Sequence, residues 1–209
     1  EMIILNKDNY PKPSLLAFKN THNKNLVCKI NNLSFSYDEK SNLLKNINLE
    51  VNKSQIIGIF GVSGSGKSTL VELLMGLIKP TSGNIEMFCD EDYNKERFFI
   101  GYVPQDIFLI DDSIEKNIAL QFDKKLINKK QLDKAIKLSQ LDNWDKIQNN
   151  AYETTIGERG NQISGGQYQR IGIARSLYHD FQLLIMDEAT SALDEINENK
   201  IIECIKELK

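Results

Sequence analysis

The sequence feature that most constrains the fold is a glycine-rich stretch, GVSGSGKST, at residues 61–69. It stands between a short apolar run at 55–60 and an amphipathic stretch at 70–78. In a strand-to-helix loop of this kind, glycines permit the conformations that aim successive backbone N–H groups inward. The beginning of the helix adds unpaired amide donors and the positive end of its dipole. The stretch therefore predicts a phosphate site for ATP or GTP.

The residues of this loop have separate predicted roles. We expect Lys67 to reach the β and γ phosphates, and the Ser68 hydroxyl to ligate Mg2+. The expected nucleotide contacts are Gly61, Val62, Ser63, Gly64, Ser65, Gly66, Lys67, Ser68 and Thr69. The alternative is a turn that only needs tight packing. Because glycine makes up about 7% of residues, the four specified positions match by chance in fewer than about one chain in a hundred of this length, which disfavours the alternative.

Composition sets broader bounds. The chain has 209 residues, 41% of them apolar, and a net charge of -3, which suits one large domain with a real core. No uninterrupted run of 18 apolar residues is present, so we expect a soluble domain without a membrane-spanning helix. Interspersed acids and bases argue against a nucleic-acid partner. Three widely spaced cysteines favour reduced packing residues over a metal site.

The order of predicted elements indicates the fold class. Apolar segments typical of strands lie at 26–37, 47–51, 55–60, 84–88, 97–103 and 182–186. Helical patterns lie at 67–78, 113–120, 131–140, 166–178 and 196–208. Because the stretch from about 104 to 178 is largely helical and lies between apolar strands, we predict an α/β core with an inserted α-helical subdomain. The first 25 residues have no clear period and are expected to be a linker.

A second chemical signal is LLIMDE at 183–188, an apolar run that ends in two carboxylates. Ligands of α/β sheets bind beyond the carboxyl ends of the strands. Asp187 is therefore a candidate Mg2+ ligand, and Glu188 a candidate base for the water that attacks the γ phosphate. Taken alone, such a run often marks only a strand that leaves the core. The phosphate loop makes the functional interpretation the stronger one.

A third signal is ISGGQYQRIGIARSLY at 163–178. Ser164 and Gln167 have the spacing of a capping box, which predicts that a helix begins here. That structural role does not explain Gly165 and Gly166, which are poor helix formers in a first turn. A helix N-terminus with a serine and two glycines predicts a second phosphate-binding surface, formed by Ser164, Gly165, Gly166 and Gln167.

Together, GVSGSGKST, ISGGQ and LLIMDEATSALD resemble the nucleotide-binding domain of an ABC transporter over about residues 26–208. The resemblance implies a P-loop NTPase core with an antiparallel β subdomain and the inserted helical subdomain, binding ATP and Mg2+. It also implies that Tyr37 stacks on adenine and that Gln105 touches Mg2+ and the attacking water. Lys67, Gln105 and Glu188 are then the catalytic residues, and Ser68, Gln105 and Asp187 the metal ligands.

The resemblance further implies partners. A second nucleotide-binding domain would pair head to tail, so that ISGGQ of one subunit faces the ATP of the other and the SALD stretch at 191–194 contacts the facing subunit. A membrane domain would contact the segment after Gln105 at the cytoplasmic face of the cell (inner) membrane. TTIGERG at 154–160 resembles a stretch of exporter-type domains, with Glu158 near the coupling helices. These features predict an ATPase that drives export or flipping, with its substrate and its homo- or heterodimeric state open.

Three departures from the family pattern qualify this prediction. Ile163 replaces the usual leucine, and residues 52–54 replace the usual glycine turn before the apolar run at 55–60. No residue matches the family's switch histidine, which we expect to lie in a C-terminal part beyond Lys209. Two alternatives stay open: a soluble ABC-type ATPase of DNA repair or translation, and a non-hydrolysing module that dimerises around ATP.

Overall fold

The computed structural model describes residues 16–20, 25–38, 41–89, 98–141, 144, 155–156, 163–189 and 194–206. The chain forms two compact units, Glu1–Phe98 and Phe99–Lys209, and each is described by itself. Among the described residues, no helix is long and apolar enough to span a bilayer.

The first unit is built on a four-stranded mixed sheet in the order β1-β4-β2-β3. Its strands are β1 (Ala17–Asn20), β2 (Leu26–Phe35), β3 (Leu44–Asn52) and β4 (Ser82–Cys89). β2 pairs antiparallel with both β3 and β4, whereas β1 runs parallel to β4. The predicted antiparallel β part is therefore confirmed.

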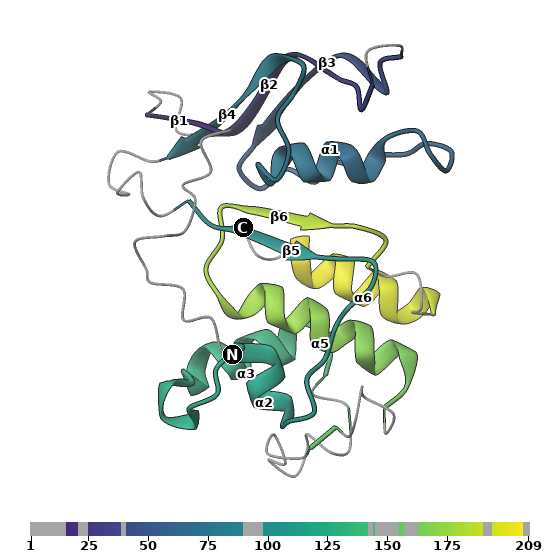
Figure 1. Ribbon diagram of the computed structural model, residues 1–209. Coiled ribbons are helices and arrows are strands. Elements are labelled where there is room, and N and C mark those ends of the chain that lie inside the picture. Colours follow the sequence, from purple (N-terminus) through teal and green to yellow (C-terminus); the bar gives the residue numbers. More distant parts are fainter. Residues whose placement is uncertain are drawn as a thin grey trace, which may run out of the picture. The chain divides into compact units, whose positions relative to one another are not determined.

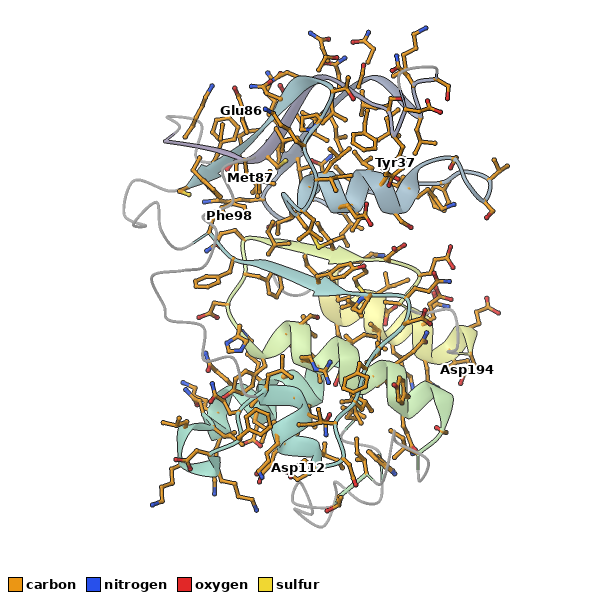
Figure 2. The ribbon with its side chains drawn as sticks, in the orientation of Figure 1. Tyr37, Glu86, Met87, Phe98, Asp112 and Asp194 are labelled. Atoms are coloured by element: carbon orange, nitrogen blue, oxygen red, sulfur yellow. The ribbon has the colours of Figure 1, made fainter. Side chains whose placement is uncertain are left out.

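Alternation along β4 fixes one face of this sheet. Glu86 forms an ion pair with Lys19, while the next residue, Met87, is fully buried (Figure 2). Successive side chains of a strand point to opposite faces, so β4 has one polar and one buried side. The helix α1 (Lys67–Leu74) lies along the sheet in the same unit and buries Leu73 and Leu74 (Figure 1).

The second unit combines a parallel strand pair with helices. β5 (Ile100–Val103) and β6 (Leu183–Met186) pair in parallel, with Val103 opposite Met186. The helical elements are α2 (Ile114–Ala119), the 3-10 turn η3 (Lys124–Leu126), α3 (Lys129–Leu138), α5 (Gly165–Tyr178) and α6 (Glu195–Lys206). α5 lies between the strand pair and the helices α2 and α3 (Figure 1).

The core of the second unit is organised around α5. Ile171, Ala174 and Tyr178 have the spacing of one helix face, and all three are buried as the sequence predicts. Side chains from α2 and α3, including Ile118 and Leu132, belong to the same cluster. Burial of this apolar surface is the main force that holds the helical part together.

Two segments differ from the sequence prediction. The run at 55–60 is not assigned as a strand, and Ile56 and Phe60 are exposed. β3 ends in a tight turn with Ser54 in the left-handed region, φ 59°, and the following run pairs with no described strand. Conversely, β1 forms inside the predicted linker at 1–25. Its four residues are too few to give a periodic signal, and its pairing with β4 stabilises it instead.

Candidate functional site

Glycines set the geometry of the phosphate loop in the first unit. Gly64 and Gly66 adopt φ values of 77° and 92°, a region that other residues rarely occupy. A Cβ on Gly66 would lie 2.9 Å from Leu44 Cδ2. Gly66 is also the N-cap of α1, and no side chain caps this helix. The first amide groups of α1 are thus left for an anion.

The side chain of Lys67, the first residue of α1, folds back onto the phosphate loop. Its Nζ donates to the carbonyl oxygens of Gly61, at 2.9 Å, and Val62, at 3.2 Å. Both acceptors are neutral groups, so the ammonium charge is not cancelled by a carboxylate through these two bonds. The lysine is therefore held beside the amide donors as a charge available to phosphate oxygens.

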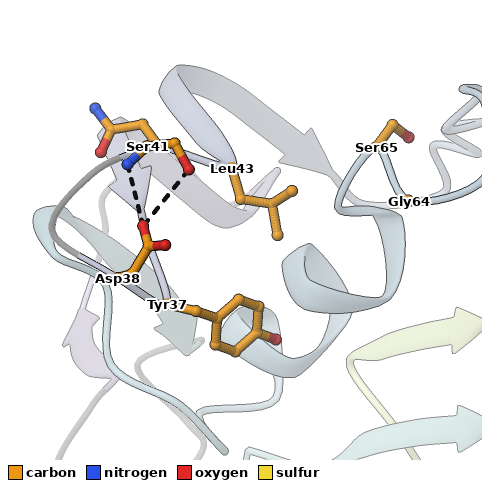
Figure 3. A pocket seen from close by; sticks show the side chains of 7 residues that line it. Tyr37, Asp38, Ser41, Leu43, Gly64 and Ser65 are labelled. Carbon is orange, nitrogen blue, oxygen red and sulfur yellow. Dashed lines mark hydrogen bonds between the residues drawn. The ribbon is translucent and has the colours of Figure 1, made fainter.

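A hollow of about 460 Å3 joins this loop to Tyr37 (Figure 3). It is lined by Tyr37, Asp38, Ser41, Asn42, Leu43, Gly64 and Ser65. The Tyr37 side chain is 70% exposed and packs edge-on against Phe35, with 4.8 Å between ring centroids. Its hydroxyl lies 3.2 Å from Thr69 Oγ1 on α1. The aromatic ring and the phosphate loop thus border one hollow, an arrangement that suits a nucleotide base and its phosphates.

In the second unit, the ends of β5 and β6 bring Gln105 and Glu188 together. The amide N–H of Asp187 donates to the carbonyl of Val103 at 2.9 Å, which extends the parallel pairing to the first carboxylate. Gln105 Nε2 then donates to Glu188 Oε2 at 3.0 Å. Glu188 itself adopts a left-handed backbone, φ 48°. Both side chains are exposed, so this polar pair is open to a water molecule.

The capping box at the beginning of α5 is confirmed. Gln167 N donates to Ser164 Oγ at 3.3 Å, and Ser164 N donates to Gln167 Oε1 at 2.9 Å. Ser164 and Gly165 are exposed, although most of the later turns of the helix are buried. The helix thus presents a free first turn while its body is packed in the core.

Comparison with known proteins places these motifs in one family. The family model described as ABC transporter matches residues 44–191. The chain belongs to the ABC transporter family. Its matched span contains the phosphate loop, the ISGGQ turn and both carboxylates, so the family resemblance and the α/β fold class are confirmed.

The names of similar ABC proteins refer to export or transport. A putative export ATP-binding/permease protein of Rickettsia typhi is 35% identical over 85% of this chain and 31% of its own length. A lactococcin-G-processing and transport ATP-binding protein of Lactococcus lactis is 36% identical over 91% of this chain and 27% of its own. The chain thus spans about a third or less of these relatives.

A solved structure is similar over nearly all of the chain. It is a bacterial Atm1-family ABC exporter with ATP bound, 30% identical with a TM-score of 0.73, covering 92% of this chain and 35% of the exporter chain. The chain is therefore an ABC transporter ATP-binding domain related to those of exporters.

The predicted ABC site residues fall into the two units. Tyr37 and the loop at 61–69 belong to the first unit, whereas Gln105, the turn at 164–167 and the two carboxylates belong to the second. Within each unit the structure brings together Tyr37 with Gly64 and Ser65, and Gln105 with Glu188. Of the SALD stretch, Asp194 is described, and its carboxylate accepts from Asn197 at the beginning of α6. Glu158 and residues 191–193 lie outside the described residues.

The predicted Mg2+ ligands suit a hard cation by their chemistry. The Ser68 hydroxyl is exposed in the first turn of α1, beside the uncapped amide groups. The side chains of Asp187 and Gln105 carry oxygen atoms, the type of ligand that Mg2+ prefers. Among the described residues, no cluster of three or more His, Cys, Asp or Glu side chains forms a complete metal site.

The sequence reasoning missed two polar residues that shape the second half of the site. Asn117 is fully buried, and its side chain bonds Ile110 through both N–H and C=O, at 2.9 and 3.0 Å. Arg175 donates to the carbonyls of Phe108 and Asn117, at 2.9 and 2.8 Å. Burial lowers the pKa of the Arg175 guanidinium, with Tyr168 acting weakly in the opposite direction. In the sequence, Asn117 and Arg175 are visible as polar residues within the helical patterns at 113–120 and 166–178, and this was the available signal for them.

Proposed function

We propose that this chain hydrolyses ATP and supplies that energy to an ABC exporter. The observation that carries the proposal is the hydrogen bond between Gln105 and Glu188, beyond the ends of two parallel strands. A carboxylate that orients water needs a neighbour that restrains it, and an exposed amide does this without changing its charge. A module that only binds ATP would not require the pair.

The residues divide the chemistry among themselves. In the first unit, Tyr37 stacks on the base, Lys67 neutralises phosphate charge, and the loop amides bind phosphate oxygens. In the second, Glu188 accepts the proton of the attacking water, and Gln105 orients that water. Bound Mg2+, held through Ser68, Gln105 and Asp187, would neutralise charge on the phosphates. Each group thus lowers the barrier by positioning or by electrostatics.

A second copy of the domain is the proposed partner. The first turn of α5 begins at the exposed residues Ser164 and Gly165 and carries two glycines. A head-to-tail pair would place this turn against the phosphates of the facing subunit. ATP would then favour the paired state by binding it more tightly than the single subunit.

A membrane domain is the other proposed partner, at the cytoplasmic face of the membrane. The relatives named as export ATP-binding/permease proteins are about three times as long as the matched span. Phe108 and Leu120 are exposed on the segment and helix end that follow Gln105. These apolar side chains suit a contact with the membrane part. The absence of a residue matching the switch histidine within this chain leads us to expect weak hydrolysis by the domain alone.

The test is the solution mass of the Glu188→Gln chain with and without Mg-ATP, measured by light scattering. This variant should keep the contacts with ATP and slow the hydrolysis of ATP. An ATP-dependent dimer is expected, and Ser164→Ala should abolish it while costing only about 1 kcal/mol of helix-cap stability. Lys67→Ala provides the matched control, because it should lose both ATP binding and dimerisation. If the chain binds ATP but stays monomeric at every protein concentration tested, the paired model is contradicted.

A further inference from the structure

One face of α5 contacts the backbone just after Gln105. Tyr168, Gly172 and Arg175 follow each other at spacings of four and three residues, so they share this face. The Tyr168 hydroxyl donates to the carbonyl of Ile107. Arg175 Nη1 donates to the carbonyl of Phe108 at 2.9 Å. We call these three α5 residues the clamp.

Gly172 allows the close approach between them. A Cβ at this position would lie 2.2 Å from Ile107 Cδ1 and 2.7 Å from its Cγ1. Ile107 is buried and therefore has little room to move. The glycine thus lets the segment rest directly on the helix backbone between the two polar contacts.

Arg175 also reaches α2. Its Nε donates to the carbonyl of Asn117 at 2.8 Å, and the Asn117 side chain in turn bonds both backbone groups of Ile110. One guanidinium therefore joins α5, α2 and the segment between Gln105 and α2. Its two acceptors, the backbone carbonyls of Asn117 and Phe108, lie 58 and 67 residues from Arg175 in the sequence.

The position of the Arg175 guanidinium is energetically unfavourable in itself. Its Nη2 is buried and has no hydrogen-bond partner among the described residues, and the groups it does bond are neutral carbonyls. Burying a cation without a carboxylate is unfavourable. A methionine of similar length would fill the same space without that cost, so packing alone does not account for an arginine here.

We propose that Arg175 is a positioning residue, which fixes the segment 106–110 to α5 and thereby holds Gln105 beside Glu188. This inference rests on the proposed ATP hydrolysis. The same helix begins with the exposed turn at 164–167, so the clamp makes this turn and Gln105 parts of one rigid body. A displacement of either would then be transmitted to the other through Arg175.

The first arm of the test is hydrogen exchange of this chain without nucleotide, with peptides spanning 106–113. The Ile110 amide donates to Asn117 Oδ1, and Arg175 bonds the backbone carbonyls of Asn117 and Phe108. Arg175→Met should speed exchange of this amide about tenfold, because the segment around it loses the hydrogen bonds donated by a charged group. Arg170→Met is the matched control, since Arg170 lies on the same helix but bonds the carbonyl of Gln140 at 2.9 Å. It should leave 106–113 unchanged. Equal exchange in wild type and Arg175→Met would overturn the clamp.

The second arm measures ATP turnover by the full-length protein. Arg175→Met should lower kcat about tenfold with KM for ATP unchanged, because the phosphate loop and Tyr37 belong to the first unit and the clamp to the second. Arg175→Lys, which keeps the charge and one donor direction, should recover part of kcat. A raised KM with normal kcat, or an unchanged kcat despite faster exchange, would refute the positioning role.

The two arms also separate this inference from the proposed function. If wild-type protein shows no ATP turnover, the proposed hydrolysis fails, while the exchange arm still decides whether α5 holds the segment. If Arg175→Met does not fold, Tyr168→Phe removes a single donor from the same segment with almost no change in volume. The phenylalanine variant should speed exchange of the Ile110 amide, which donates to Asn117 Oδ1, because the segment loses its bond from Tyr168. Normal exchange of this amide would contradict the clamp.

Discussion

Two loops carry the predicted nucleotide chemistry, and they are held in opposite ways. The phosphate loop at 61–69 keeps its shape through its own backbone: two glycines in the left-handed region, and Lys67 bonded to two carbonyls of the same loop. The segment at 105–110 is held from outside, by Arg175 and Asn117. A self-contained loop can be recognised from its sequence, whereas an externally held loop depends on residues that lie far away along the chain.

The largest expected effect concerns Glu188, the hydrogen-bond partner of Gln105 in the externally held loop. Glu188→Gln should lower the ATP turnover of the full-length protein by about 10²- to 10⁴-fold, because the amide cannot accept the proton of the attacking water. Affinity for Mg-ATP should be preserved, since the phosphate loop is unchanged. Steady-state hydrolysis and equilibrium nucleotide binding measure the two quantities. Turnover equal to wild type would remove Glu188 from the mechanism.

The second prediction tests how much the buried Asn117, which holds the segment 105–110, contributes to stability. Asn117→Asp places a buried carboxylate where Nδ2 donates to the carbonyls of Ile110 and Ser113, at 3.0 and 3.1 Å. The free energy of unfolding of the second unit should fall by about 3 kcal/mol or more. Urea denaturation at neutral pH measures it.

Asn128→Asp is the control for that change. Asn128 is an exposed N-cap whose Oδ1 accepts from Lys130 N and Gln131 N, and a carboxylate accepts the same bonds. Its effect should therefore be close to zero. If both substitutions have equal effects on unfolding, the buried network does not support the segment.

The third prediction tests the self-contained loop. Gly66→Ala combines a forbidden backbone region with a close contact to Leu44, and should cost about 1–3 kcal/mol together with a loss of ATP affinity. Gly64→Ala has the same kind of φ but no heavy atom within 4 Å of the added Cβ, so it isolates the backbone cost. Calorimetric titration of both variants with Mg-ATP would separate the effect of the backbone from that of the contact with Leu44. Equal affinities in wild type and Gly66→Ala would mean that the loop tolerates another shape.

The smallest effect belongs to the ion pair between Asp112 and Lys116, which lies just after the externally held loop. Asp112 is labelled in Figure 2. The Lys116 ammonium, which bonds its carboxylate at 2.9 Å, is the main cause that lowers the pKa of this carboxyl. A lowered pKa contributes stability above the unfolded value of about 3.9, and this contribution is lost as pH falls through the folded value. Asp112→Asn should therefore flatten the acid loss of stability by less than about 0.5 kcal/mol. Urea midpoints between pH 5 and 3 test the sign, and a steeper loss in the variant would contradict it.

Sequence reasoning succeeded where the physics is local. The capping box at Ser164 and Gln167 and the buried stripe of α5 depend on residues within two or three turns, so their patterns are visible in the sequence. The strand predictions at 26–37 and 84–88 succeeded for the same reason. The roles predicted for Tyr37 and for the metal ligands stay predictions.

Sequence reasoning failed where distant partners decide the outcome. The apolar run at 55–60 has the composition of a strand, but a strand exists only with a hydrogen-bonded neighbour, and the described residues provide none. β1 shows the reverse case, because pairing with β4 makes a strand of four unremarkable residues. Arg175 was missed since a charge on a helix is normally read as solvent-exposed.

The left-handed backbone of Glu188 has a consequence for anyone who tries to improve this protein. Holding a non-glycine residue there costs about 1 kcal/mol, and asparagine would adopt the same conformation more easily. A library sorted only for heat resistance would therefore enrich asparagine at this position and discard the carboxylate. If Glu188 has the proposed role, selection for heat resistance and selection for ATP turnover favour different residues here, so only a screen that also measures turnover would retain the carboxylate.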